Sequence, residues 1–312
     1  MKAKIKIGTR GSPLALAQVD VFVSALVKAH PHLKADGAIE IVKISTLGDR
    51  TQAANTPLPE DGGGKAYFAK EIEAALLDGA IDCAVHSLKD MPAILPEGLV
   101  IPCVLPREDP RDVFFARDAK TIEDLPEGAV VGTTSPRRGA FLLAMRPDLK
   151  IVTFRGNVGT RLKKLEDGVV DATLLAVAGL NRLGLSHLAK NILDPAVMLP
   201  AAAQGAIGIE VREDDAALRD MIAPAHCAVT ELRVTAERAF LEVMDGSCRT
   251  PLAALMEAPD PEGRARFDVA AANPDGTGLK KLSYLMSVQH VGDAERLGRH
   301  AGKEMREKCK AS

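Results

Sequence analysis

The chain has 312 residues, of which 46% are hydrophobic, and 40 basic side chains nearly balance 42 acidic ones for a net charge of −2. This length is sufficient for two or three domains with packed cores. The balanced charge, together with no Trp, two Tyr and eight Phe, argues against a nucleic-acid-binding protein, which usually has a basic surplus or aromatic stacking platforms.

The first ten residues, MKAKIKIGTR, alternate in polarity and predict a β-strand rather than a signal peptide or a membrane span. Ser12 then offers an N-cap and Pro13 a first helical residue for the apolar-periodic stretch up to about residue 29. The sequence AIEIVKIST, residues 38–46, predicts a second strand. Residues 47–66 are polar and rich in Gly and Pro, so we expect a long functional loop there.

A helix is predicted for FAKEIEAALLDG (68–79) and a strand for IDCAVH (81–86). Strand and helix patterns then alternate to about residue 220, which indicates α/β layers with largely parallel sheets. From residue 228 onward the pattern changes. A long helix ending at Gly246, three strand-like segments and a polar terminal helix predict a small α+β domain.

Two pairs of segments resemble each other in the same order. GTRGSP (8–13) resembles GTTSPR (132–137), and LDGAIDCAV (77–85) resembles EDGVVDATL (166–174). The order favours two related α/β domains. The alternative is a pair of unrelated strand-to-helix turns.

Both of these turns lead into helix N-termini, where free backbone N–H groups and the helix dipole favour anions. Arg10 lies in the first turn, and Arg137 and Arg138 lie in the first helical turn of the second. Cations at a helix N-terminus oppose the dipole, so they indicate a negatively charged ligand that offsets the cost. Solvated charges are the alternative.

Further arginines occupy loops and element ends, and planar guanidinium groups bind carboxylates in a bidentate manner. We therefore expect a basic cleft in an otherwise balanced protein. These arginines are Arg155, Arg161, Arg182, Arg212 and Arg249.

The sequence VHSLKDMP (85–92) ends a predicted strand, which is where ligands bind in α/β proteins. For His86 a hydrogen-bonded structural role is favoured over catalysis. Asp90 is either a ligand-facing carboxylate or a cap or ion-pair partner, and Lys89 beside it would keep it ionised.

The five cysteines are scattered and form no CxxC pair, which indicates neither a metal site nor disulfides but a reduced, cytoplasmic compartment. Cys83, Cys103 and Cys227 are expected to be small buried side chains, and Cys309 to be incidental in a polar helix. Cys248 differs, because GSCRTP surrounds it with small residues and an arginine, the setting of a reactive thiol.

Together these segments resemble the porphobilinogen deaminase (hydroxymethylbilane synthase) family from residue 5 to about residue 255. The matching motifs are GTRGSPLALAQ, GGGKAYFAKEIE, DCAVHSLKDMP, REDPRDVF, GTTSPRRGAFL, RGNVGTRL, LLAVAGLNRLG, LPAAAQGAIGIEVR and GSCRTP. The resemblance implies an α/β fold with two hinged domains of the periplasmic-binding-protein type (type II) and a small α+β C-terminal domain. The implied domains are residues 1–105 with 200–226, residues 106–199 and residues 227–312.

The resemblance also implies the chemistry. Cys248 would hold a dipyrromethane cofactor through a thioether bond. That cofactor would prime the addition of four porphobilinogen units, with loss of ammonia, to give hydroxymethylbilane for tetrapyrrole and haem biosynthesis. The two cofactor rings and the four added rings each carry an acetate and a propionate, which makes twelve carboxylates in total. The arginines would bind these carboxylates. We expect a monomer that binds no nucleic acid and no membrane.

The implied roles follow position by position. Asp90 would be the catalytic carboxylate. The cofactor would be held by Cys248, Ser12, Lys89, Arg137, Arg138 and Asp90. The substrate and growing chain would be bound by Arg10, Arg155, Arg161, Arg182, Ser87, Lys65 and Phe68. Gln18 and Gln204 would lie nearer the domain interior.

Two positions depart from the family pattern: Pro136 stands where leucine is common, and Ala66-Tyr67 where Gly-Leu is common.

Two other classes of protein remain open from the residues alone. A hinged anion-binding protein without catalysis would use the same arginines but leaves Cys248 unexplained. A thiol-nucleophile enzyme would need a histidine paired with Cys248.

Overall fold

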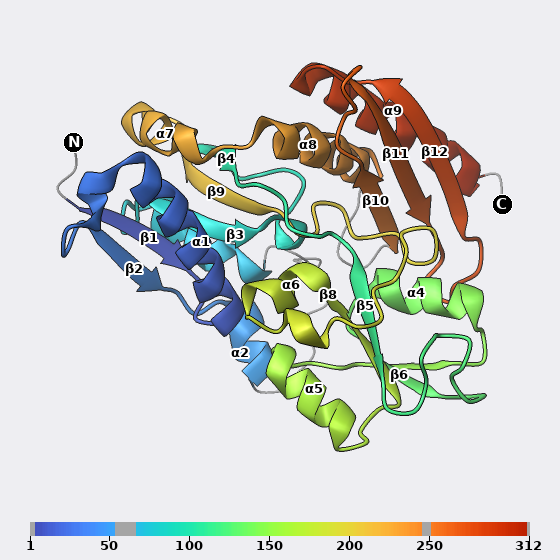
Figure 1. Cartoon of the computed structure of the whole chain (residues 1–312). Coiled ribbons are helices and arrows are strands. Elements are labelled where there is room, and N and C mark those ends of the chain that lie inside the picture. Colours follow the sequence, from blue (N-terminus) through green and yellow to red (C-terminus); the bar gives the residue numbers. More distant parts are fainter. Residues whose placement is uncertain (1–3, 54–66, 245–250, 311–312) are drawn as a thin grey trace. The chain divides into compact units, whose positions relative to one another are not determined.

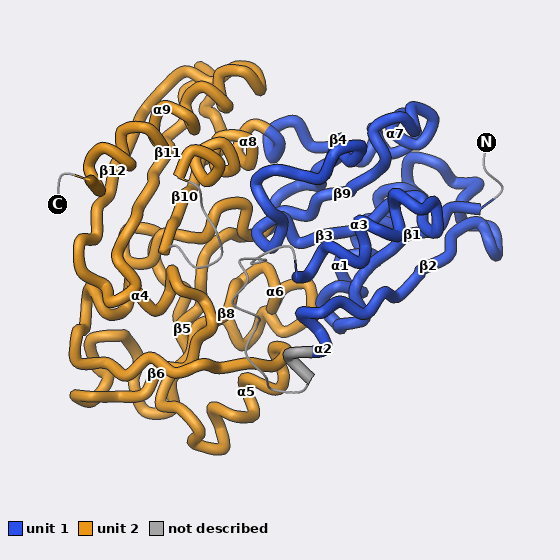
Figure 2. The backbone as a smooth tube through the Cα atoms, turned by 180° about the vertical axis from the view of Figure 1, so that it is seen from behind, with its two compact units in different colours: residues 1–108, 206–231 blue, residues 109–205, 232–312 orange. Residues whose placement is uncertain are grey.

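The computed structural model describes residues 4–53, 67–244 and 251–310. The chain divides into two compact units, which are coloured separately in Figure 2. Unit 1 comprises Met1–Glu108 and Ala206–Glu231, and unit 2 comprises Asp109–Gly205 and Leu232–Ser312. Both units are therefore discontinuous in sequence, and the predicted division into three domains stays a prediction.

Unit 1 is built on a five-stranded sheet with the order β2-β1-β3-β9-β4 (Figure 1). Its central strand pairs are parallel: β1 (Ile5–Thr9) pairs with β2 (Ile39–Lys43) and with β3 (Cys83–Ser87). In contrast, β9 (Ile207–Arg212) runs antiparallel to both β3 and β4 (Leu99–Val104). The expectation of largely parallel sheets is thus wrong for this half of the sheet.

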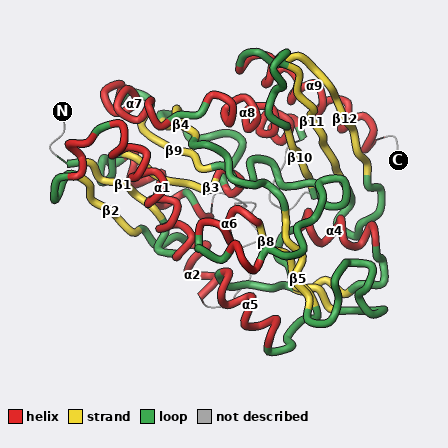
Figure 3. The backbone as a smooth tube through the Cα atoms, in the orientation of Figure 1, coloured by secondary structure: helices red, strands yellow, loops and turns green. Residues whose placement is uncertain are grey.

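The α-helices in the described part of unit 1 are α1 (Pro13–Ala29), α2 (Leu47–Ala53) and α7 (Ala216–Ile222), which Figure 3 labels, and α3 (Lys70–Leu77), which Figure 2 labels. The core forms where α1 covers the sheet, and Phe22 is fully buried there. Burial of one such side chain contributes about 1.5–3 kcal/mol. As predicted, the Ser12 Oγ caps α1 by accepting the N–H of Ala15, with Pro13 as the first helical residue.

Residues 47–53 are helical, which corrects the expectation of a loop from residue 47. The Oγ1 of Thr46 accepts the N–H of Asp49 at 3.2 Å, and the Asp49 carboxylate accepts the N–H of Thr46 at 3.3 Å. This reciprocal pair is a capping box, which starts a helix even in a Gly-containing sequence. The rest of the expected loop, residues 54–66, lies outside the described residues.

Unit 2 contains a four-stranded sheet with the order β5-β8-β6-β7. Strand β6 (Val130–Gly132) is parallel to β7 (Lys150–Val152) and to β8 (Ala172–Ala176), whereas β5 (Asp112–Ala116) is antiparallel to β8. The connecting helices are α4 (Pro136–Met145), α5 (Val158–Glu166) and α6 (Val177–Arg182).

Four strands of each sheet share one arrangement, which agrees with the internal resemblance. The strand before the repeated turn, β1 or β6, lies between two parallel partners, and an antiparallel strand, β9 or β5, pairs with β3 or β8. The Asp82 carboxylate accepts the N–H of Lys6 at 2.8 Å, and the Asp171 carboxylate accepts the N–H of Val130 at 2.8 Å. The same side chain therefore links the same two strands in both units.

The C-terminal part of unit 2 matches the predicted α+β elements. Helix α8 (Ala228–Val243) precedes an antiparallel sheet of β10 (Leu252–Met256), β11 (Arg264–Ala271) and β12 (Lys280–Ser287), and α9 (Val291–Lys310) ends the chain.

Close helix packing holds this part together. A Cβ at Gly298 of α9 would lie 2.2 Å from the carbonyl oxygen of Ala236 in α8, so only glycine permits this approach. Among the described helices, none is long and apolar enough to cross a membrane.

Candidate functional site

Unit 1 has a cavity where β1 and β3 end and α1 begins. It combines charged, hydroxyl and apolar side chains, and several predicted site residues lie in it. Its lining residues are Arg10, Ser12, Leu14, Ala15, Gln18, Phe68, Val85, His86, Ser87, Asp90 and Met91. The structure thus brings together Arg10, Ser12, Phe68, Ser87 and Asp90.

Asp90 reaches this cavity because a short, well-anchored turn follows β3. The turn spans Leu88–Asp90, and the N–H of Leu88 donates to the carbonyl of Ala206 at 3.1 Å. Leu88 is buried, and its side chain fills the space next to Gly208, where a Cβ would lie 2.4 Å from it. Buried packing therefore holds the turn that presents the Asp90 carboxylate.

Ser87 and Gln18 connect the end of β3 to α1. The Ser87 Oγ lies 2.7 Å from Nε2 and 3.0 Å from Oε1 of Gln18. Gln18 is buried, which agrees with its expected place in the domain interior. Lys89, in the turn after Ser87, is half-buried.

Arg10 is held by partners within unit 1. Its Nε donates to Asp49 Oδ1 at 3.1 Å, and its guanidinium carbon lies 4.4 Å from the ring centroid of Phe68. Burial alone would raise the pKa of Asp49, but hydrogen bonds from Arg10 and Thr46 outweigh it and lower that pKa. Arg10 therefore faces an ionised internal carboxylate.

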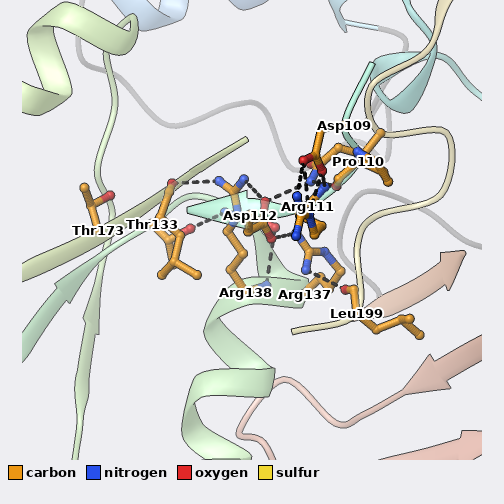
Figure 4. Close-up of polar contacts among 12 residues, drawn as sticks. Asp109, Pro110, Arg111, Asp112, Thr133, Arg137, Arg138, Thr173 and Leu199 are labelled. Atoms are coloured by element: carbon orange, nitrogen blue, oxygen red, sulfur yellow. Dashed lines mark hydrogen bonds and ion pairs between the residues drawn. The ribbon is translucent and has the colours of Figure 1, made fainter. Parts of the chain in front are cut away.

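In unit 2, Arg137 and Arg138 share one buried carboxylate, that of Asp112 (Figure 4). Nη2 of Arg137 lies 2.7 Å from Oδ2, and Nη2 of Arg138 lies 2.6 Å from Oδ1. Their Nη1 atoms donate to main-chain oxygens, that of Arg137 to Leu199 at 2.8 Å and that of Arg138 to Leu174 at 2.9 Å.

Asp112 is ionised in this setting. Burial would raise its pKa, but the two arginines outweigh burial and lower it far below the ordinary value. The amide of Gln204 adds a further hydrogen bond to Oδ1 at 2.8 Å. The negative partner that sequence reasoning sought for these helix-start arginines is thus supplied in part by the chain itself.

The arginine cluster still suits an acidic ligand. Two guanidinium groups pair with one carboxylate, so one positive charge is not compensated. In addition, the Nε atoms of Arg137 and Arg138 are buried and have no hydrogen-bond partner. Such donors are costly to leave unpaired.

The predicted substrate-binding arginines of unit 2, Arg155, Arg161 and Arg182, lie around the ends of α5 and α6 and are half-buried. The Nε of Arg161 donates to the carbonyl of Gly156 at 2.9 Å, and Nη2 of Arg182 donates to the carbonyl of Gly205 at 2.6 Å. Arg155 lies in the turn before α5, and its carbonyl accepts from Lys164 at 3.1 Å.

Arg212 is different from these arginines, because it serves the framework of unit 1. Its Nη1 donates to the carbonyls of Leu76 at 2.6 Å and Ile81 at 2.9 Å. Its expected place in a basic cleft is therefore not supported. Cys248, Arg249 and Lys65 lie outside the described residues, so their roles stay predictions.

The two departures from the family pattern differ in consequence. Pro136 is the first residue of α4, where the Ser135 Oγ accepts the N–H of Arg138 at 3.4 Å, so proline suits the helix start. Tyr67 is buried, and Ala66 lies outside the described residues.

Sequence reasoning missed Asp49, Asp112, Glu73 and Glu210, which all pair or interact with site residues. Two of them had a local signal. Asp49 stands three residues after Thr46, as a capping box requires, and Glu210 interrupts the apolar run AIGIEV.

The two α/β units have matching strand arrangements. Arg10 lies at the first strand-to-helix turn of one unit, and Arg137 and Arg138 lie at that of the other. These features define a protein of the α/β class with sites suited to carboxylates. Residues 5–220 match the family described as porphobilinogen deaminase, dipyromethane cofactor binding domain, and residues 231–307 match the porphobilinogen deaminase C-terminal domain. The chain belongs to the porphobilinogen deaminase family.

Individual relatives agree. Porphobilinogen deaminase of Paracoccus denitrificans (strain Pd 1222) is 52% identical over 310 residues, covering 98% of this chain and 95% of the relative. The chloroplastic enzyme of Oryza sativa subsp. japonica is 48% identical over 305 residues, covering 98% of this chain and 84% of the relative.

Among solved structures, a YaeC-family lipoprotein from Enterococcus faecalis V583 aligns with a TM-score of 0.43 at 16% identity, covering 79% of this chain and 98% of that one. The family matches confirm the predicted family, enzyme class and dipyrromethane cofactor. The mixed α/β sheets and the matched C-terminal domain confirm the fold class.

Proposed function

We propose that the chain joins four porphobilinogen molecules head to tail, releases ammonia at each addition, and yields linear hydroxymethylbilane. The observation that supports this most strongly is the position of Asp90, presented by a buried turn into a cavity that also contains Arg10 and Ser12. A single carboxylate among anion-binding groups suits a reaction in which positive charge develops on an acidic substrate.

Asp90 is proposed as the catalytic residue. Loss of ammonia leaves an electron-poor pyrrole, and attack by a second pyrrole spreads positive charge over the ring nitrogens. A preorganised carboxylate accepts their N–H groups and stabilises that charge. It also moves protons to the leaving amine and from the new bond-forming carbon.

The arginines are proposed to bind the acetate and propionate side chains. Arg137 and Arg138 offer buried, unpaired Nε–H donors, and Arg10 offers a guanidinium for which the substrate would compete with Asp49. Arg155, Arg161, Arg182, Ser87, Lys65 and Phe68 are proposed to hold the substrate and the growing chain.

Cys248 is proposed to hold the dipyrromethane by a thioether bond, with Ser12, Lys89, Arg137, Arg138 and Asp90 as its polar partners. When bound, this group supplies the free α-carbon from which the chain grows. We further propose three domains, with residues 1–105 and 200–226, 106–199 and 227–312, in a cytoplasmic monomer.

The intact mass of the denatured, purified protein tests this function. We expect a mass increase of two pyrrole units, located by peptide mapping on the peptide that contains Cys248. The variant Cys248→Ser should lack the adduct and the activity, whereas Cys309→Ser, which changes an exposed thiol of α9, should keep both. An active enzyme without the adduct would contradict the proposal, and adduct-free protein that binds porphobilinogen without product would indicate a binding protein.

A further inference from the structure

A buried cluster of three titratable side chains adjoins the cavity of unit 1. His86 on β3 pairs in register with Gly208, and Ala84 pairs with Glu210 on β9. His86 and Glu210 therefore project from the same face of the sheet, two residues out of register. His86 Nε2 lies 2.8 Å from Glu210 Oε2.

Glu73 of α3 completes the cluster, since α3 packs against both β3 and β9. All three side chains are shielded from solvent, with exposed fractions of 6% for His86, 0% for Glu210 and 6% for Glu73. His86 is the member that also lines the cavity containing Asp90.

The cluster contains two carboxyl groups but only one imidazole. Oε1 of Glu73 and Oε1 of Glu210 are both buried and accept no hydrogen bond. Two ionised carboxylates and one imidazole would leave an uncompensated buried charge, which is costly. Burial and the Glu210 carboxylate raise the pKa of Glu73 to about 7, although the His86 ring opposes the shift.

Two charged groups that neighbour the cluster in sequence, Arg212 and Glu71, are engaged elsewhere. Arg212 follows Glu210 on the same face of β9, but it donates to main-chain carbonyls and pairs with Asp215 at 3.3 Å. On α3, Glu71 accepts from the N–H of Leu47 and from Arg50, both at 2.8 Å.

On the cavity side, the charged lining residues are Arg10 and Asp90, and Arg10 pairs with Asp49. No group of His, Cys, Asp or Glu within the described ranges is arranged to hold a metal ion. Among the described residues, the ion pair within the cluster joins Glu210 to His86, and one bound proton would offset the charge of the second carboxylate.

We propose that Glu73, Glu210 and His86 form a proton relay that holds one exchangeable proton beside the Asp90 cavity. This inference rests on the proposed function. In each addition the C–N bond of the aminomethyl group breaks, and its electron pair leaves with ammonia. The free α-carbon of the growing chain attacks the electron-poor pyrrole, and after the new C–C bond forms this α-carbon loses its proton.

One proton thus moves from carbon to nitrogen per addition. The relay donates a proton towards the leaving amine and regains one from the α-carbon, so its proton content is unchanged over a cycle. His86 faces the cavity in this scheme, and the two glutamates are positioning residues that act through it.

The test is the pH dependence, from about pH 6 to about pH 9, of single-turnover porphobilinogen addition to cofactor-loaded enzyme. Glu73→Gln keeps the shape of the side chain but cannot titrate. We expect its rate to fall roughly 10-fold at neutral pH, a modest share of the effect of general acid–base groups. Its pH profile should lose the ionisation near neutrality, while KM changes less than about twofold.

Asp78→Asn is the matched control, because it neutralises an exposed carboxylate at the end of the same helix. It should leave the rate and the pH profile unchanged. A Glu73→Gln enzyme with the wild-type rate and profile would overturn the relay.

An infrared measurement covers the case in which a variant folds poorly. Wild-type protein should show the carbonyl band of a protonated buried carboxyl at about pH 6 that fades by about pH 8. The band should persist in Asp78→Asn and be absent in Glu73→Gln, and a wild type without it contradicts the relay. If wild-type enzyme forms no hydroxymethylbilane, the proposed function fails instead, and the band still reports on the cluster.

Discussion

Arg10 and Asp49 form a bidentate ion pair at the cavity of unit 1, with Nε of Arg10 3.1 Å from Oδ1 and 3.3 Å from Oδ2 of Asp49. The same carboxylate accepts the N–H of Thr46 at the start of α2. One side chain therefore both starts a helix and occupies the guanidinium that is proposed to bind substrate.

The first prediction follows from this competition. Asp49→Asn keeps an oxygen for the helix cap but removes the charge that holds Arg10. We expect the KM for porphobilinogen to fall about threefold, within the energy range of a partly exposed ion pair. Steady-state kinetics would show it.

Glu71→Gln is the control, since Glu71 anchors α2 through Leu47 and Arg50 but does not contact Arg10. It should leave KM unchanged. A rise in KM for Asp49→Asn would mean that Asp49 orients Arg10 for the substrate instead of competing with it.

The second prediction concerns the charge of Asp90. Asp90→Asn should reduce single-turnover addition at least ~100-fold, as expected for loss of a preorganised charged group. Asp90→Glu keeps the charge but displaces it by ~1 Å, so it should retain measurable activity below the wild type. Both variants should carry the cofactor when supplied with preformed product, as intact mass would show. Near-normal addition by Asp90→Asn would assign a structural role to the carboxylate.

The third prediction concerns the buried partner of Arg137 and Arg138. Asp112→Asn should lower the free energy of unfolding by about 3–5 kcal/mol, because it leaves two buried guanidinium groups without a counter-charge. Urea unfolding would measure this loss.

Asp167→Asn removes an exposed ion pair with Lys163 in the same unit and should lower the free energy of unfolding far less than Asp112→Asn. Equal stability losses in the two variants would show that Asp112 is not the counter-charge of the cluster.

The fourth prediction concerns stability and pH. The pKa of Glu73 is raised from 4.5 to about 7 in the folded protein, so the folded state binds more protons than the unfolded state between these values. Stability should therefore decrease as pH rises from about 4.5 to about 7, by up to about 3 kcal/mol.

Glu73→Gln should remove this part of the pH dependence and be relatively more stable than wild type at about pH 8. Thermal unfolding at several pH values would reveal the difference. Parallel stability curves for wild type and Glu73→Gln would contradict it.

Local sequence patterns predicted most of the elements, because caps and side-chain periodicity act over a few residues. Ser12 and Pro13 start α1 as expected, and the strand signals around residues 81–86 and 251–289 fall on β3 and on β10, β11 and β12. The capping box of Thr46 and Asp49 is equally local and is visible in the sequence. Helix α2 was not predicted because the segment contains glycine and is rich in polar residues, which are typical of loops.

The repeat was also present in the sequence, since Asp82 and Asp171 recur at matching places and make matching hydrogen bonds. The direction of each strand, in contrast, could not be predicted from the sequence. Strands β5 and β9 join their sheets antiparallel after distant crossings of the chain, and alternating polarity does not record the direction of a partner strand.

What the sequence alone determined is most of the elements, the family and the positions of the arginines and Asp90 along the chain. Only the tertiary structure decided which charges meet. Asp112 meets Arg137 and Arg138 across 25 and 26 residues, and Glu210 meets His86 across 124 residues. Such pairs form because sheet register and burial bring distant side chains together, and no local propensity encodes a contact between residues that far apart.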